Sequence, residues 1–314
     1  MIVNPTPLPE ALGLSNSAQK QTNCGRTCGD PLTVKSDHML RCWCLVFLAA
    51  SVAHSQVPDL PPDAEIIPNL VYASPGGHDL HLDLFCPKSG ERPFAAVIYL
   101  HGGGWRSGSR RQFYRYAAKM AGAGFVGATI EYRLSGEARY PAAIEDSRAA
   151  VRWLRAHAAK YRIDPLRIGA AGQSAGGYLA ALLGVGTNAA EEVRAVAAFN
   201  PITDLTSVTE GEAGEAVTAF LGTTYTAGAE IWREASPLTH VSRRSAPMLF
   251  LHGTADTTVP HRQSVVMCAA LRKAAVPCEI YSAEGKGHLW FFNSETDFIA
   301  TLLLMEDFFR RYIQ

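Results

Sequence analysis

The sequence lacks an excess of charge of either sign. Its 314 residues include 29 Lys and Arg and 29 Asp and Glu, so the formal net charge is +0. Nucleic acids and anionic membranes attract proteins through clustered positive charge, so the composition supports neither kind of partner. No internal repeat or long low-complexity tract is visible, and the length suits one α/β domain with a tail.

Cysteines are also few, 7 in all. Cys24 and Cys28 form a close pair, but no second pair follows at the spacing of a zinc site. We therefore expect no metal, and no motif indicates an organic cofactor. Cys268 and Cys278 could form a disulfide in an exported protein. One is expected on a helix and the other at the start of the next strand, so bridging distance stays an open question.

Near the N-terminus lies an apolar run that is too short to span a bilayer comfortably. Residues 39–55 combine one basic residue, a short apolar core and small residues in an A-x-S pattern, which is typical of a secretory signal. We expect Met39 to be the true start, residues 1–55 to lie outside the folded domain, and the product to be secreted or periplasmic. A membrane-anchoring or amphipathic extension is the alternative.

Residues 172–176 read Gly-Gln-Ser-Ala-Gly and lie between a run typical of a buried strand and one typical of a helix. G-x-S-x-G in that setting predicts a nucleophile elbow. Side chains at the flanking positions would clash in so tight a turn, which accounts for both glycines. The turn would raise the Ser174 hydroxyl above the sheet. The bare pattern also fits an ordinary strand-to-helix turn.

Residues 101–105 read His-Gly-Gly-Gly-Trp and directly follow the apolar run 95–100. Acyl transfer needs N–H donors placed where the oxyanion forms, and glycines let the backbone present them. We expect Gly103, together with Gly102 or Gly104, to supply one donor and Ala175 the other. A phosphate-binding loop would need the lysine of G-x-x-x-x-G-K-[ST], which this segment lacks.

Two later loops supply a candidate acid and base. Asp256 follows a strand that ends near His252, and His288 follows a strand at residues 278–281. Loops at the carboxyl ends of strands form the sites of open α/β sheets. The order Ser174, Asp256, His288 is that of α/β hydrolases, with His288 as base and Asp256 as its orienting acid. Asp204 is the alternative acid, although a turn or cap role suits it better.

These segments together resemble the α/β-hydrolase superfamily, and within it the bacterial carboxylesterases near the hormone-sensitive-lipase group. Residues 131–134, 140–146 and 172–177 are similar to those of secreted acetylxylan and feruloyl esterases. The resemblance covers roughly residues 65–312. Gln173 departs from lipase-group members, which carry Asp before the serine, and the long N-terminal cap of those enzymes is missing.

Alternating strands and helices predict an α/β-hydrolase fold, with a mostly parallel sheet of about eight strands and helices on both faces. The catalytic domain would span residues 56–314, with a small cap insertion at about 201–240. The cap is poor in large apolar side chains. Five of them could form one small wall of the site: Phe220, Leu221, Tyr225, Ile231 and Trp232.

The resemblance implies a serine carboxylesterase for short-acyl esters, either small molecules or esters on a polysaccharide such as xylan. We place Trp105, Gln173 and Trp290 at the substrate, although both tryptophans could simply pack in the core. An arylformamidase-like amide hydrolase, a lipase-like enzyme for longer acyl chains and a non-enzymatic binding module remain alternatives. The sequence leaves the oligomeric state open.

Overall fold

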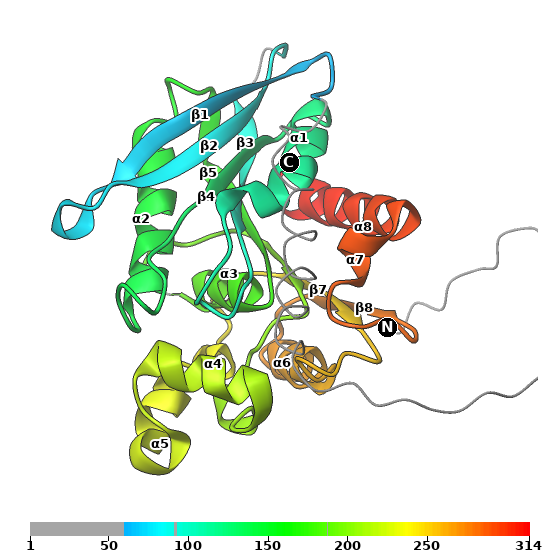
Figure 1. The fold of residues 1–314 in the computed structure, drawn as a ribbon. Coiled ribbons are helices and arrows are strands. Elements are labelled where there is room, and N and C mark those ends of the chain that lie inside the picture. The colour runs from blue at the N-terminus through cyan, green and yellow to red at the C-terminus, as the bar shows by residue number, and fades with distance from the viewer. Residues whose placement is uncertain (1–59, 91–92, 187) are drawn as a thin grey trace, which may run out of the picture. The chain divides into compact units, whose positions relative to one another are not determined.

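The computed structural model describes residues 60–90, 93–186 and 188–314 (Figure 1). The expected N-terminal extension and signal, residues 1–55, lie outside the described residues. The strands are β1 Ala64–Ala73, β2 Leu80–Pro87, β3 Phe94–Leu100, β4 Val126–Ile130, β5 Ile163–Gln173, β6 Val196–Phe199, β7 Met248–Gly253 and β8 Cys278–Ala283. The α-helices are α1 Tyr114–Gly122, α2 Ala142–Ala156, α3 Ala175–Val185, α4 Gly211–Leu221, α5 Tyr225–Glu234, α6 Arg262–Lys273, α7 Trp290–Asn293 and α8 Glu295–Ile313.

The strands form one sheet of eight in the order β1-β2-β4-β3-β5-β6-β7-β8. Strand β2 pairs antiparallel with both β1 and β4. The remaining pairs, β4–β3, β3–β5, β5–β6, β6–β7 and β7–β8, are all parallel. One core includes side chains of α2, α3 and α6, and another those of α1 and α8, so helices cover both faces (Figure 1). This is the expected α/β-hydrolase fold.

The register of the parallel strands brings the predicted site segments together. Leu100 at the end of β3 pairs with Gly172, and Gln173 at the end of β5 pairs with Phe199. On the far side, Gly253 of β7 pairs with Ala283 of β8. The loops that follow β3, β5, β7 and β8 therefore leave the same edge of the sheet, as parallel pairing requires.

The cap, residues 201–240, folds mainly as α4 and α5, which lie below α3 in Figure 1. Helix α4 is capped at its C-terminus by Gly222, whose left-handed conformation (φ 76°) suits a residue without a Cβ. Phe220, Leu221 and Trp232 are at most 5% exposed and belong to the core. The expectation that they form a small wall of the site is wrong, because α4 turns Phe220 and Leu221 inward and α5 does the same with Trp232.

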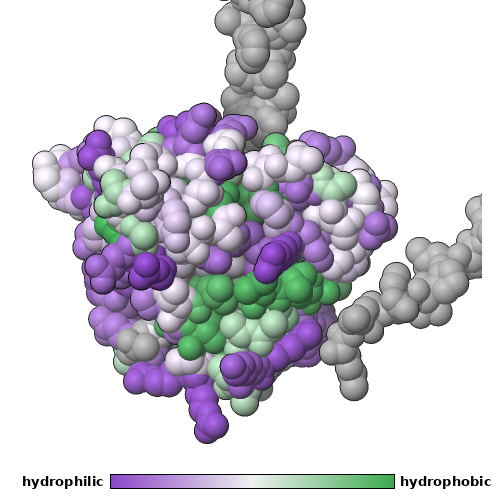
Figure 2. Space-filling view, turned by 90° about the horizontal axis from the view of Figure 1, so that it is seen from below, coloured by the Kyte–Doolittle hydropathy of each residue, from purple (hydrophilic) through white to green (hydrophobic). Residues whose placement is uncertain are grey.

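Cys268 of α6 and Cys278 of β8 form a disulfide, with Cα atoms 5.5 Å apart. This resolves the open question about their distance, because α6 packs closely along the strand that follows it. In the described part of the chain, no helix is long and apolar enough to cross a membrane. Seen from below, the side on which α4, α5 and α6 lie in Figure 1, an apolar band runs between hydrophilic side chains (Figure 2).

Candidate active site

Ser174 lies at the turn between β5 and α3 with φ 54° and ψ −117°, a strained conformation for a residue other than glycine. Its backbone N–H donates to the carbonyl of Phe199 at 2.8 Å, which ties the turn to β6. A Cβ on Gly172 would lie 2.2 Å from the carbonyl oxygen of Gly176, and one on Gly176 would lie 2.0 Å from that of Leu100. Only glycine fits at either position, so the turn has the geometry of a nucleophile elbow.

His288 and Asp256 come together from the loops that follow β8 and β7. Nδ1 of His288 lies 2.6 Å from Oδ2 of Asp256, while Oδ1 accepts the backbone N–H groups of Thr258 and Val259 at 2.9 and 2.8 Å. Burial raises the pKa of Asp256, but hydrogen bonds from His252 and His288 outweigh it, so the pKa lies well below its usual range. The carboxyl group is therefore ionised and can orient an imidazole.

Asp204 has a different role. Its Oδ1 accepts the N–H of Thr206 at 3.0 Å and the Thr206 hydroxyl at 2.6 Å, so it caps the 3₁₀ turn Leu205–Ser207. This is the cap role that the sequence favoured for it. The structure thus places Asp256, and not Asp204, beside His288.

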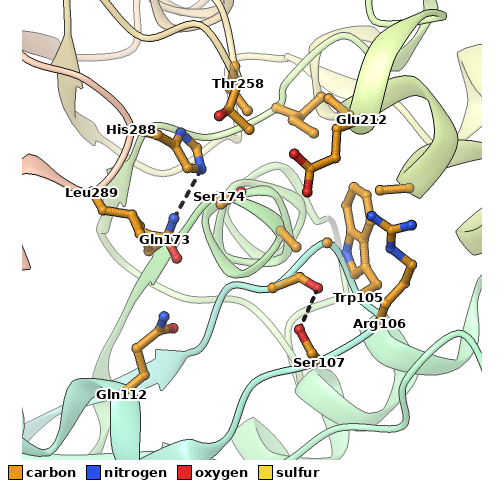
Figure 3. A pocket seen from close by; sticks show the side chains of 17 residues that line it. Trp105, Arg106, Ser107, Gln112, Gln173, Ser174, Glu212, Thr258, His288 and Leu289 are labelled. Carbon is orange, nitrogen blue, oxygen red and sulfur yellow. Dashed lines mark hydrogen bonds between the residues drawn. The ribbon is translucent and has the colours of Figure 1, made fainter. Parts of the chain in front are cut away.

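The other ring nitrogen of His288 faces Gln173. Its Nε2 lies 3.2 Å from Nε2 of Gln173, a contact drawn as a dashed line in Figure 3. With Nδ1–H donating to Asp256, Nε2 accepts a hydrogen bond from the Gln173 amide. Although Ser174 lies next in the chain, no hydrogen bond joins it to His288 among the residues that the structure describes.

The structure excludes one of the three glycines that we expected to supply oxyanion donors. The N–H of Gly102 donates to Oε1 of Gln112 at 2.6 Å, so it is already used and is not a free donor. Gly103, Gly104 and Ala175 line the pocket beside Ser174. The two loop glycines have φ values of 111° and 60°, which favour glycine. The sequence offered no sign of the Gln112 contact.

His101 anchors the start of this loop from inside the protein. Its Nδ1 lies 2.8 Å from the carbonyl oxygen of Gly102, and its own carbonyl accepts the Tyr132 hydroxyl at 2.7 Å. The two rings are stacked with centroids 4.2 Å apart. Burial lowers the pKa of His101 to about 4, so the ring is neutral near pH 7 and Nδ1 carries the proton that it donates. The loop geometry is thus fixed before a substrate arrives.

The pocket above Ser174 has a volume of about 450 Å³, within the usual range for small-molecule sites. Trp105 lines the pocket and stacks on Phe220, with centroids 4.3 Å apart. Figure 3 shows Glu212 of α4 and Arg106 near Trp105, across the pocket from His288. Apart from Trp105, the apolar part of the lining is made of small and medium side chains: Ala175, Ile202, Ala213, Ala216, Val259 and Leu289.

Trp290 does not form the expected wall of this pocket. It begins α7, is only 4% exposed, and packs against Tyr281 and Phe291 with centroids 5.9 and 5.7 Å away. Helix α7 turns its indole ring into the core, while Leu289, the preceding residue, lines the pocket. In the part of the chain that the structure describes, no group of three or more His, Cys, Asp or Glu side chains could hold a metal ion.

Comparison with known proteins agrees with this fold. The solved structures that resemble the chain include a truncated carbohydrate esterase from gut microbiota, with a TM-score of 0.71 and 28% identity over 80% of this chain and 98% of that one. Esterase 2 of Thermogutta terrifontis, in its apo form, gives a TM-score of 0.69 and 31% identity over 82% and 97% of the two chains. Other structures of that esterase carry propionate or butyrate, or are phosphonylated by sarin.

Esterase LipQ of Mycobacterium tuberculosis is 31% identical over 237 residues, which are 68% of this chain and 55% of LipQ. The chain spans about half the length of the curated relatives it matches. The family model named BD-FAE matches residues 82–271, which is more than half of the chain. The chain therefore belongs to the BD-FAE family, and its fold is that of the α/β-hydrolase esterases.

Proposed function

We propose that the chain is a serine carboxylesterase with Ser174 as nucleophile, His288 as base and Asp256 as orienting acid. The observation that carries the proposal is the 2.6 Å contact between His288 and Asp256, on loops beside a strained elbow serine. An ionised acid that holds the Nδ1–H tautomer leaves Nε2 free of a proton, as a general base requires. The curated and structural relatives named as esterases support the same chemistry.

In the proposed reaction, Oγ of Ser174 bonds to the ester carbonyl carbon while its proton passes to Nε2 of His288. Gly103, Gly104 and Ala175 line the pocket beside Ser174, and their N–H groups are the proposed donors to the oxyanion. Collapse of the intermediate breaks the bond to the alcohol, which leaves with the proton from His288. Water then attacks the acyl-enzyme and gives a proton to His288. Release of the acid returns that proton to Ser174.

The substrate that we propose has a short acyl group, acetyl to butyryl, on a bulky and hydroxyl-rich alcohol such as a xylan chain. Apart from Trp105, the apolar lining consists of small and medium side chains, Ala213 and Ala216 among them, so a long acyl chain would bury little of its length there. The exposed Arg106 and Glu212 border the pocket and suit hydroxyl groups. The carbohydrate esterase from gut microbiota and the propionate- and butyrate-bound esterase support this choice.

We further propose that the enzyme is exported, with cleavage near Gln56. The signal-like residues 39–55 and the Cys268–Cys278 disulfide support export, since disulfides persist in oxidising compartments. Intact-mass measurement after expression in a secreting bacterium tests cleavage. An active soluble product that retains residues 1–55 would refute it.

The mechanism is tested with Ser174→Ala on p-nitrophenyl acetate. Loss of the nucleophile leaves only binding and oxyanion effects, so the rate should fall on the order of 10⁴-fold. Near-normal turnover would overturn the proposal.

The substrate is tested by kcat/KM across acyl lengths, by acetate release from acetylated xylan, and with methyl ferulate. A maximum at octanoyl without acetate release would favour a lipase-like enzyme, and faster formamide hydrolysis an arylformamidase-like one.

A further inference from the structure

The carboxylate of Asp256 contacts the imidazole rings of two histidines. Nδ1 of His288 lies 2.6 Å from Oδ2 of Asp256, and Nε2 of His252 lies 3.5 Å from the same oxygen. His252 is the next-to-last residue of β7, and its side chain and that of Asp256 are both fully buried. In the sequence His252 marks only the end of a strand, and the proposed reaction leaves it without a role.

The tautomer of His252 follows from its two other contacts. Nε2 lies 2.9 Å from the carbonyl oxygen of Val259, and Nδ1 lies 2.7 Å from Oγ of Ser264. A carbonyl can only accept, so Nε2 must carry a proton, and in the neutral ring Nδ1 then accepts the Ser264 hydroxyl proton. The Nε2–H group of His252 therefore points at the turn that holds Asp256. It lies close to both the Val259 carbonyl and the Asp256 carboxylate.

Both oxygens of the Asp256 carboxylate are held by contacts with the protein. Its Oδ1 accepts two backbone N–H groups, from Thr258 and Val259, and its Oδ2 lies between the two histidines. The Val259 carbonyl, held by His252, belongs to the same short turn, residues 256–259. Ser264 is on α6, so His252 connects that turn to a helix outside it. A change at His252 would release the turn and the carboxylate together.

We propose that His252 is a positioning residue of the esterase. It directs Oδ2 of Asp256 toward His288 and does not touch the substrate. The proposal rests on the proposed function, because it concerns the acid of that triad. Displacement of a catalytic group by about 1 Å can cost about 100-fold in rate. Loss of His252 should therefore reduce kcat far more than it changes KM, since only Thr258 and Val259 of the pocket lining belong to this turn.

The test compares His252→Ala, His252→Gln and His261→Ala. The glutamine amide can approach the place of Nε2 and donate from it, whereas alanine cannot. His261 is the matched control: its ring packs edge-on against His252 with centroids 5.3 Å apart, and its Nε2 contacts Ser282 at 2.9 Å. Each rate is divided by the concentration of active sites, titrated with a serine-directed phosphonate, and each variant's Tm is measured.

We expect His252→Ala to lower kcat about 10- to 100-fold, with KM within about twofold of wild type. His252→Gln should recover much of the loss, and His261→Ala should keep near-normal kcat. If His252→Ala does not fold, Ser264→Ala removes the hydroxyl that holds the ring and should lower kcat several-fold by the same route.

If His252 had a purely structural role, the His252→Ala change would lower Tm and the number of titratable sites. It would leave kcat per active site unchanged, and that result would overturn the proposal. Equal losses for His252→Gln and His252→Ala, or unchanged kcat per site in Ser264→Ala when His252→Ala does not fold, would overturn it as well. Failure of the proposed function is distinguishable, because Ser174→Ala would then retain turnover.

Discussion

Nε2 of Gln173 lies 3.2 Å from Nε2 of His288, the atom that must take the proton of Ser174 in the proposed reaction. Gln173 is 2% exposed and lines the pocket. In the structure the Gln173 amide donates a hydrogen bond to the lone pair on Nε2 of His288. The amide must leave that lone pair before the serine proton can be transferred, and an arriving substrate in the same pocket could displace it.

Replacement of Gln173 by glutamate should shift the pH dependence of catalysis. A carboxylate at this place would stabilise the imidazolium form of His288. The reaction needs the neutral ring, so the acid limb of the kcat/KM profile should move to higher pH, by about one to two pH units. Gln173→Met, similar in length and uncharged, is the control. Identical profiles for the two variants would contradict the expected contact.

Asp256→Asn should leave the protein folded but lower kcat by several thousand-fold or more, because the amide favours the wrong tautomer of His288. Asp204→Asn is the matched control and should cost far less, since Asp204 caps a 3₁₀ turn. Kinetics on p-nitrophenyl acetate, with Tm for both variants, check this. The reverse ranking would move the acid to Asp204.

His101 should make stability depend on pH. Its folded-state pKa of about 4 lies below the ordinary value of 6.5, so between these values the unfolded chain binds more protons. Stability should be unaffected above about pH 6.5 and fall by about 3 kcal/mol toward pH 4. His101→Asn keeps a donor for the Gly102 carbonyl and does not titrate. Its urea-unfolding free energy should therefore fall less over this range. Parallel curves would contradict the expectation.

The Cys268–Cys278 disulfide should stabilise the fold by about 2–4 kcal/mol. The double variant Cys268→Ala/Cys278→Ala should therefore unfold about 5–15 °C lower. Cys86, a buried free cysteine, supplies the control variant Cys86→Ala. Reducing agent should lower the Tm of the wild type and of the control, but not that of the double variant. A Tm insensitive to reductant in all three proteins would show that the disulfide does not contribute.

The sequence predicted the sheet and the elbow correctly because both depend on local patterns. Apolar runs marked the parallel strands, and residues 172–176 required a tight turn whichever helix covered it. The loops of Asp256 and His288 could be placed because parallel strands leave the sheet at the same edge. Their distance of 2.6 Å needed the structure.

Contacts between separate elements could not be predicted in this way. The use of the Gly102 N–H by Gln112 depends on how the loop folds back over ten residues. The inward direction of Trp290 depends on α7, a helix of four residues without a sequence signal. The closeness of Cys268 to Cys278 depends on how α6 packs along β8. The role of His252 required both the turn at Asp256 and the position of Ser264 on α6.

The stack of Trp105 on Phe220 has a consequence for enzyme kinetics. One ring belongs to the segment after β3 and the other to α4, and both are at most 1% exposed, so the cap cannot swing away without exposing two large aromatic surfaces. Substrate entry then does not wait for the cap to open. Turnover should follow a plain saturation curve as an ester passes its solubility limit, without the jump in rate that marks interfacial activation.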